Sequence, residues 1–216
     1  RDRSQELADE LSNYGARMDY LSNAGVFLIK TLFGIYEIII LMRFLMQVVR
    51  ADIYNPITQF VVKASSPPLR PLRRLIPGAA GMDIASLVLL LILIIVELLL
   101  LSLISNLPMP SVIGLIALAL VEMLKLTIYV FMFSVIILAI LSWVSPGGYN
   151  PVANLLYQIT APLMRPARRM LPPMGGLDLT PMLVIIVLYL LILLLVDPLQ
   201  NWAGHLAYGV PLAVLR

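Results

Sequence analysis

Four long apolar blocks, which only a lipid bilayer accommodates, dominate this chain. They run over residues 26–49, 84–103, 121–144 and 181–196. The hydrocarbon core of a bilayer is about 30 Å thick, and a helix needs about 20 apolar residues to cross it. Only 12% of the residues are charged, against about 25% in an ordinary soluble domain. We therefore predict an all-α membrane protein with about four transmembrane helices.

The residues outside these blocks give the expected domain organisation. Residues 1–17 form a polar segment, interpreted either as a non-native extension before Met18 or as a short soluble amphipathic helix. Residues 106–120 are expected to form a turn and a shallow lead-in to the third span. One upright helix over 112–144 would be about 50 Å long, which exceeds the thickness of the bilayer core. Residues 199–216 are expected to form an interfacial tail.

The chain repeats itself at an offset of 95 residues. Within residues 54–83, 11 of 30 positions are identical to the position 95 residues further on. The matches are mainly Arg, Pro, Asn, Gly and Asp, which the apolar composition of membrane spans does not produce by chance. The repeated structural positions are Asn55, Pro56, Pro67, Pro71, Pro77 and Asp83 in the first copy, and Asn150, Pro151, Pro162, Pro166, Pro172 and Asp178 in the second.

Each copy of this unit lies between two apolar blocks. Repeat 1 therefore covers residues 18–105 and repeat 2 covers residues 121–198. Because each repeat contributes two spans, both repeats enter the membrane from the same side. We predict parallel repeats, in contrast to the inverted repeats of many transporters.

The repeated residues, with Tyr-Asn-Pro at the start, Arg-Pro-Leu-Arg-Arg or Arg-Pro-Ala-Arg-Arg in the middle and Gly-x-Asp at the end, resemble the YggT family of small bacterial integral membrane proteins. The resemblance extends over about residues 20–200. It implies a loose link to osmotic adaptation, to the cell-division region in other bacteria and to cytochrome assembly in plastids. It implies no catalytic residue.

Each copy carries three arginines at positions i, i+3 and i+4, which share one face of a helix. These candidate lipid- or partner-binding residues are Arg70, Arg73 and Arg74 in the first copy, and Arg165, Arg168 and Arg169 in the second. Apolar residues fill the opposite face, which predicts a short amphipathic helix at the membrane surface with Pro71 in its first turn and Pro77 at its end. A basic residue near an anionic leaflet contributes about 1 kcal/mol to membrane binding. Topology signalling with lipid contact, docking of a partner and anion binding on a permeation route remain alternatives.

The arginine-rich loops also predict the orientation. The segment 104–111 between the repeats carries no charge. By the positive-inside rule, both Arg/Pro loops face the cytoplasm and both termini face outward. We expect a multi-pass protein of the bacterial inner membrane, in contact with anionic headgroups and with a second copy or another membrane protein.

Asp83 and Asp178 directly precede the second and fourth spans. We interpret them as helix N-caps, with metal or proton binding as the alternative. The Asn-Pro pairs that begin at Asn55 and Asn150 are interpreted as turns from a span into a surface helix.

Five charged residues lie within the apolar blocks: Lys30, Glu37, Glu97, Glu122 and Lys125. A charge at mid-bilayer costs at least about 2.5–3.5 kcal/mol, so these side chains should face one another, water or the interface. Glu122 and Lys125 are three residues apart and can pair on one helix face. Structural pairing between helices and a proton or cation relay are the two interpretations.

Composition argues against catalysis. The chain has no cysteine and a single histidine, His205, which removes thiolate chemistry and multi-histidine metal sites. We predict no cofactor, no metal and no nucleic-acid partner, and we do not expect an enzyme.

Two functions follow from these features. The first is a membrane scaffold or assembly factor that acts through the Arg/Pro loops, for which the family resemblance implies a link to envelope or osmotic adaptation. The second is an oligomeric channel or transporter that uses the intramembrane carboxylates, and a lipid-shaping protein is a third, weaker interpretation.

Overall fold

The computed structural model describes residues 3–76, 82–105, 107–144, 150–170 and 178–209. Side chains are described from Tyr20 onward within these ranges, except those of residues 143 and 144. Its regular elements in this part of the chain are helices. They are α1 (Arg3–Val48), α2 (Pro56–Leu75), α3 (Ile84–Ile104), α4 (Val112–Val144), α5 (Pro151–Met170), α6 (Thr180–Leu191), the π-helical turn η1 (Ile192–Val196) and α7 (Asp197–Tyr208).

Four helical segments are long and apolar enough to cross a membrane, which confirms the predicted fold class. They are Tyr20–Val48, Ile84–Ile104, Val112–Ser142 and Thr180–Tyr208. Many of their large apolar side chains point away from the protein; Phe27, Leu32 and Leu194, for example, are more than half exposed. Such a surface is stable only when lipid covers it.

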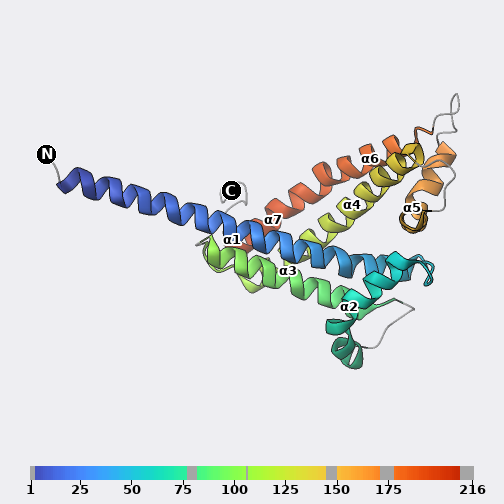
Figure 1. The fold of residues 1–216 in the computed structure, drawn as a ribbon, viewed down its shortest axis with the longest axis horizontal. Helices are drawn as coiled ribbons and strands as arrows, with labels where there is room; N and C mark the ends of the chain where they lie inside the picture. The colour runs from blue at the N-terminus through green and yellow to red at the C-terminus, as the bar shows by residue number, and fades with distance from the viewer. Residues whose placement is uncertain (1–2, 77–81, 106, 145–149, 171–177, 210–216) are drawn as a thin grey trace.

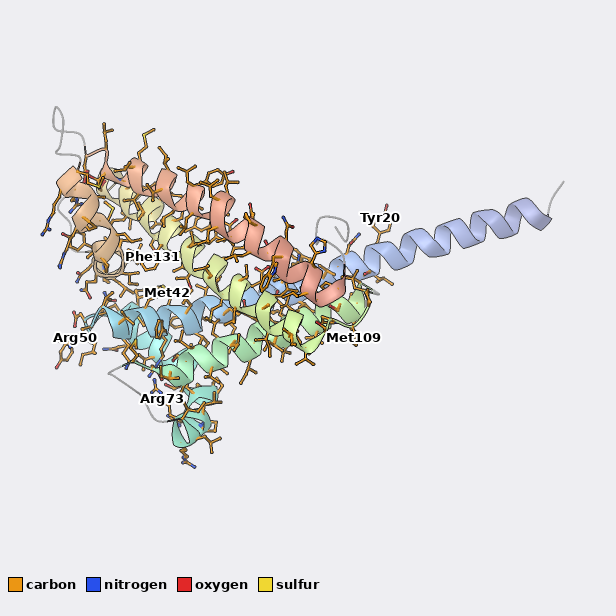
Figure 2. The ribbon with its side chains drawn as sticks, turned by 180° about the vertical axis from the view of Figure 1, so that it is seen from behind. Tyr20, Met42, Arg50, Arg73, Met109 and Phe131 are labelled. Atoms are coloured by element: carbon orange, nitrogen blue, oxygen red, sulfur yellow. The ribbon has the colours of Figure 1, made fainter. Side chains whose placement is uncertain are left out.

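The spans form two helix pairs, α1 with α3 and α4 with α6 and α7 (Figure 1). Helices α2 and α5 lie at the same end of the molecule, as parallel repeats require. Tyr20 and Met109 mark the opposite end, and Arg50 and Arg73 lie at the α2 end (Figure 2). We call these the tyrosine end, with Tyr20, and the arginine end, with Arg73.

The third and fourth spans are longer than expected. Helix α4 runs without interruption from Val112, so the lead-in expected at residues 106–120 is not separate from the span. The helix continues through Pro198 to Tyr208, so the described part of the segment expected as an interfacial tail from residue 199 is helical and continuous with the fourth span.

The turn η1 explains how the helix passes Pro198. Proline has no amide hydrogen and its ring clashes with the carbonyl four residues earlier in a regular α-helix. In η1 the Asp197 N–H donates to the Ile192 carbonyl, five residues back, which widens the backbone directly before the proline. The fourth span therefore continues past Pro198, where the sequence predicts an end.

Helices α2 and α5 are also longer than predicted, at 20 residues each. Asn55 caps α2, because its Oδ1 accepts from the Ile57 N–H at 2.9 Å. Asn150 does the same for α5, accepting from the Val152 N–H at 2.9 Å. Each following proline takes the first helical position, where a missing amide hydrogen costs nothing.

The other described prolines of the repeat do not start helices. The expectation that Pro71 stands in a first turn was wrong, because it lies inside α2. Inside the same two helices are also Pro67, Pro162 and Pro166. Pro77 and Pro172 lie outside the described residues.

Candidate functional site

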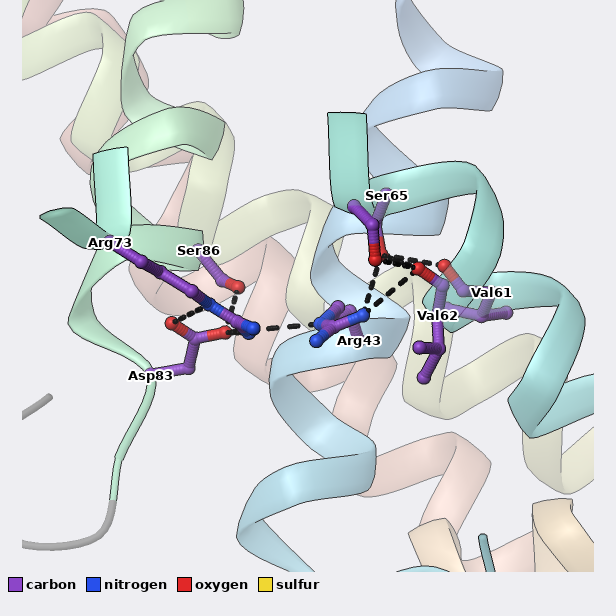
Figure 3. Close-up of polar contacts among 8 residues, drawn as sticks. Arg43, Val61, Val62, Ser65, Arg73, Asp83 and Ser86 are labelled. Carbon is purple, nitrogen blue, oxygen red and sulfur yellow. Dashed lines mark hydrogen bonds and ion pairs between the residues drawn. The ribbon is translucent and has the colours of Figure 1, made fainter. Parts of the chain in front are cut away.

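The arginine end is held together by an ion pair between α2 and the start of α3. Arg73 donates to Asp83 through both Nε, at 3.4 Å, and Nη2 (Figure 3). Ser86 donates to the same carboxylate at 2.6 Å. Asp83 is only 5% exposed, so these donors replace the water that its charge has lost.

Arg43 of α1 joins the same group. Its Nε lies 3.9 Å from the Asp83 carboxylate, and its Nη1 donates to the Val62 carbonyl and to Ser65 of α2 (Figure 3). Burial alone would raise the pKa of Asp83, but the hydrogen bonds from Arg73 and Ser86 and the two positive charges outweigh it and hold the pKa below its usual value. Three helices of repeat 1 therefore meet at one ionised carboxylate.

Repeat 2 has an equivalent pair at the same offset of 95 residues. Arg168 of α5 lies 3.3 Å from the carboxylate of Asp178. The pKa of Asp178 is also lowered, because its hydrogen bonds with Thr180 and the charge of Arg168 outweigh partial burial. Both partners are 43% exposed, and Arg168 also lies 5.8 Å from the centre of the Tyr157 ring. The second pair is thus the more solvated version of the first.

These pairs divide each arginine triplet. All three arginines of each triplet are exposed, but only the middle one binds an aspartate of its own repeat. The outer two make no ion pair with the described residues: Arg70 and Arg74 in α2, and Arg165 and Arg169 in α5. The outer two stand four residues apart and therefore share one helix face. The sequence alone does not distinguish the three arginines of a triplet, whereas in the structure only the middle one pairs with an aspartate.

The aspartates have a different role from the one expected. Asp83 occupies the N-cap position of α3, but its side chain makes no capping hydrogen bond and binds Arg73 instead. Asp178 accepts the Thr180 N–H at 3.0 Å as well as pairing with Arg168. The capping interpretation is therefore wrong for Asp83 and only partly describes Asp178.

Two further hydrogen bonds join the repeats at this end. The Asn55 Nδ2 donates to the Pro151 carbonyl at 2.7 Å, and the Asp52 N–H donates to the Gln158 Oε1 at 3.0 Å. Asn55 is 1% exposed. The starts of α2 and α5 are thereby fixed relative to each other.

A second polar site lies among α1, α3, α4 and α7. It is a cavity of about 490 Å³ that contains all five of the intramembrane charged residues. Its charged and polar lining consists of Lys30, Glu37, Glu97, Ser102, Ser105, Glu122, Lys125, Tyr129, Gln200 and Tyr208. The spans thus gather in one place the charges that the sequence shows only as separate interruptions.

Gln200 connects two of these charges. Lys125 Nζ donates to the Gln200 Oε1 at 2.8 Å, and the Gln200 Nε2 donates to Glu122. The pairing expected between Glu122 and Lys125 therefore runs through an amide of α7 rather than directly. The sequence analysis missed Gln200 because it assigned this part of the chain to a tail. The repeat offset points to this residue, because Gln200 lies 95 residues after Ser105 and both residues line the cavity.

Glu37 and Glu97 form the other acidic part of the lining. Their carboxyl groups are close enough to share a hydrogen bond. Glu37 is 5% exposed, and its Oε1 has no hydrogen-bond partner among the described residues. Among those residues no group of three or more His, Cys, Asp or Glu side chains is arranged to hold a metal ion.

The fold and the paired Arg–Asp contacts define the class: a multi-pass α-helical membrane protein built from two copies of one unit. The CCB3/YggT family model matches residues 22–104 and 117–199, which start 95 residues apart. The chain belongs to this family.

Several uncharacterised bacterial proteins are similar to this chain. A Pseudomonas aeruginosa protein is 43% identical over 202 residues, covering 85% of this chain and 94% of the relative. The YggT protein of Escherichia coli K12 is 37% identical over 193 residues, covering 89% of this chain and all of the relative. A Vibrio alginolyticus protein is 38% identical over 165 residues, covering 76% of this chain and 89% of the relative. No solved structure matches the chain.

Proposed function

We propose that this protein is a non-enzymatic membrane scaffold or assembly factor that acts through its arginine end. The observation that carries the proposal is the division of each triplet into one arginine that pairs with an aspartate and two exposed arginines that make no ion pair with the described residues. The exposed arginines of α2 and α5 are free to bind anionic lipid headgroups or an acidic surface of a partner. The hydrogen bonds between the starts of these helices support a single docking surface rather than two independent loops.

The proposed location is the bacterial inner membrane with the arginine end in the cytoplasm. The positive-inside rule supports this orientation, because the described connection at the tyrosine end, residues 107–111, carries no charge. A role in envelope or osmotic adaptation is part of the proposal and follows from the family resemblance. Reporter fusions after Leu75 and after Met109 test the orientation, which fails if the fusion after Leu75 reports the outer side.

Crosslinking in cells followed by purification tests the scaffold function. The test variant replaces the four exposed arginines, Arg70, Arg74, Arg165 and Arg169, with glutamine. A defined protein crosslinked to the wild type and lost from this variant supports the proposal. Replacing Lys63 of α2, which is exposed but outside the triplets, is the matched control and should retain the partner. Recovery of lipid alone from the wild type contradicts the scaffold role.

A second candidate function is an oligomeric channel or transporter for ions. The cavity among the spans favours it, because three carboxylates and two lysines gather there inside the membrane. Flux measurements in proteoliposomes test it. Unchanged flux in Glu97→Gln and Glu122→Gln would exclude a relay through these carboxylates.

A further inference from the structure

The cavity has the size and lining of a small-molecule site. Its volume of about 490 Å³ falls within the roughly 300–1,000 Å³ of ligand pockets. One part of its wall is apolar and includes Leu98, Leu101 and Leu118, and the other part carries the charged groups. A bare metal ion would leave most of this space unfilled.

Acidic groups outnumber basic groups in the lining, with three carboxyl groups against two ammonium groups. Glu122 is connected to Lys125 through Gln200. Glu37 is the most buried of the three carboxyls and retains an oxygen without a partner among the described residues. The cavity therefore offers an acidic acceptor to a ligand that carries positive N–H groups.

We propose that this cavity binds a small organic ammonium ion, with its N–H groups on Glu37 and its carbon chain against the leucines. An ammonium group donates to the free Glu37 oxygen, and its charge takes the place of the proton that Glu37 and Glu97 otherwise share, because a buried carboxylate is tolerated only when it is paired and hydrogen-bonded. The apolar wall provides the contact area for an alkyl chain. Among the described residues, the absence of a metal-holding group of side chains favours this ligand over a divalent metal.

The lining extends to the tyrosine end. It includes Ser105, Leu107 and Tyr208, beside the connection between α3 and α4. The Tyr208 hydroxyl is 2.8 Å from that of Ser102, which ties α7 to α3 there. The cavity therefore extends toward the end opposite the exposed arginines, and this proposal is independent of the scaffold function.

Binding of butylammonium chloride to the purified full chain in neutral phosphatidylcholine nanodiscs tests the proposal. Sodium chloride at equal ionic strength controls for salt, and sodium butyrate presents the same chain with the opposite charge. We expect saturable binding by calorimetry and a raised unfolding temperature with butylammonium only. Methylammonium should bind more weakly, by about tenfold or more, because three methylene groups lose contact with the apolar wall.

Substitutions locate the site. Glu37→Gln should weaken butylammonium binding by about tenfold or more, since a charge-assisted hydrogen bond is lost. Asp197→Asn removes a carboxylate of the fourth span that does not line the cavity, and it should leave binding unchanged. If Glu37→Gln does not fold, Leu101→Trp fills the cavity from α3 and should abolish binding.

Three results would overturn the proposal. The first is no effect of butylammonium beyond that of sodium chloride, which would mean that the cavity holds only water or a proton. The second is equal binding of butyrate, and the third is wild-type affinity in both Glu37→Gln and Leu101→Trp. Loss of the four exposed arginines should change none of these readouts, so failure of the scaffold function and failure of this site are distinguishable.

Discussion

Arg73 binds Asp83, and Arg168 binds Asp178, in each case ten residues further along the chain. The two pairs are equivalent positions of the repeat, but the first aspartate is 5% exposed and the second 43%. The same Arg–Asp pair is therefore formed once with a buried aspartate and once with an exposed aspartate. This difference gives the first prediction.

Asp83→Asn should destabilise the protein more than Asp178→Asn. In repeat 1 the substitution leaves two arginines beside a neutral, buried side chain, which costs about 1–3 kcal/mol. An exposed pair contributes only about 0–1 kcal/mol. Thermal unfolding in detergent measures both, and equal effects would contradict the assignment of Asp83 as the centre of the network.

The lowered pKa of both aspartates predicts a dependence of stability on pH. A carboxyl whose pKa is lower in the folded state stabilises the fold above its unfolded pKa, about 3.9. That contribution is lost as the pH falls through the folded-state pKa. Acid titration of unfolding should therefore show a smaller loss of stability for Asp83→Asn than for the wild type, because the variant has already lost this contribution. A parallel loss in both proteins would contradict the prediction.

Gln200→Leu should destabilise the packing of α7 on α4. It removes the amide that binds Lys125 and Glu122, and buried groups left without a partner cost about 1–3 kcal/mol. Asn201→Leu is the matched control on the same helix, because Asn201 is exposed and has no described role in the cavity. Unfolding temperatures that fall equally for the two variants would contradict the bridging role of Gln200.

Gly114→Ala should force α4 and α7 apart. A Cβ atom at this position would lie 2.2 Å from the Cα and N of Ala207, and a backbone cannot yield as a flexible side chain does. Small residues allow such close approach of helices in membranes. Gly34→Ala is the control, because a Cβ there meets no atom within 4 Å and alanine favours a helix by about 1 kcal/mol. A lower melting temperature for the first and an equal or higher one for the second are expected.

Asn55→Ala should cost more than Asn150→Ala. Both lose a helix cap, worth about 1 kcal/mol. Asn55 additionally loses its bond to the Pro151 carbonyl, a buried contact between the repeats worth about 1 kcal/mol more. A crosslink between α2 and α5 should also weaken only in Asn55→Ala. Identical stability and crosslinking in the two variants would show that the contact does not join the repeats.

Much of the fold was predictable from local properties of the chain. Apolar blocks of span length predict the four transmembrane segments, because hydrocarbon requires a continuous apolar helix. The offset of 95 residues predicts the two parallel units, with α2 and α5 at one end. The Asn-Pro pairs mark the starts of those helices, although the sequence alone suggests turns there.

The polar sites were only partly predictable. Low dielectric demands a partner for each of Lys30, Glu37, Glu97, Glu122 and Lys125, so their gathering in one cavity agrees with the expectation that they face one another. This requirement does not specify which residue becomes the partner of each charge. Gln200 was missed because Pro198, two residues after the last apolar run, was interpreted as a helix end.

The class of protein, the number of spans and the repeat follow from the linear chain alone, because hydropathy and residue identity do not depend on how the chain folds. Tertiary packing was needed to show which arginine of each triplet pairs with an aspartate, since Arg73 reaches Asp83 because α2 lies against α3. It also decided that α7 continues past Pro198 and brings Gln200 to Glu122 and Lys125. These outcomes depend on which backbone bends and which helices pack together, and no local pattern of residues specifies either.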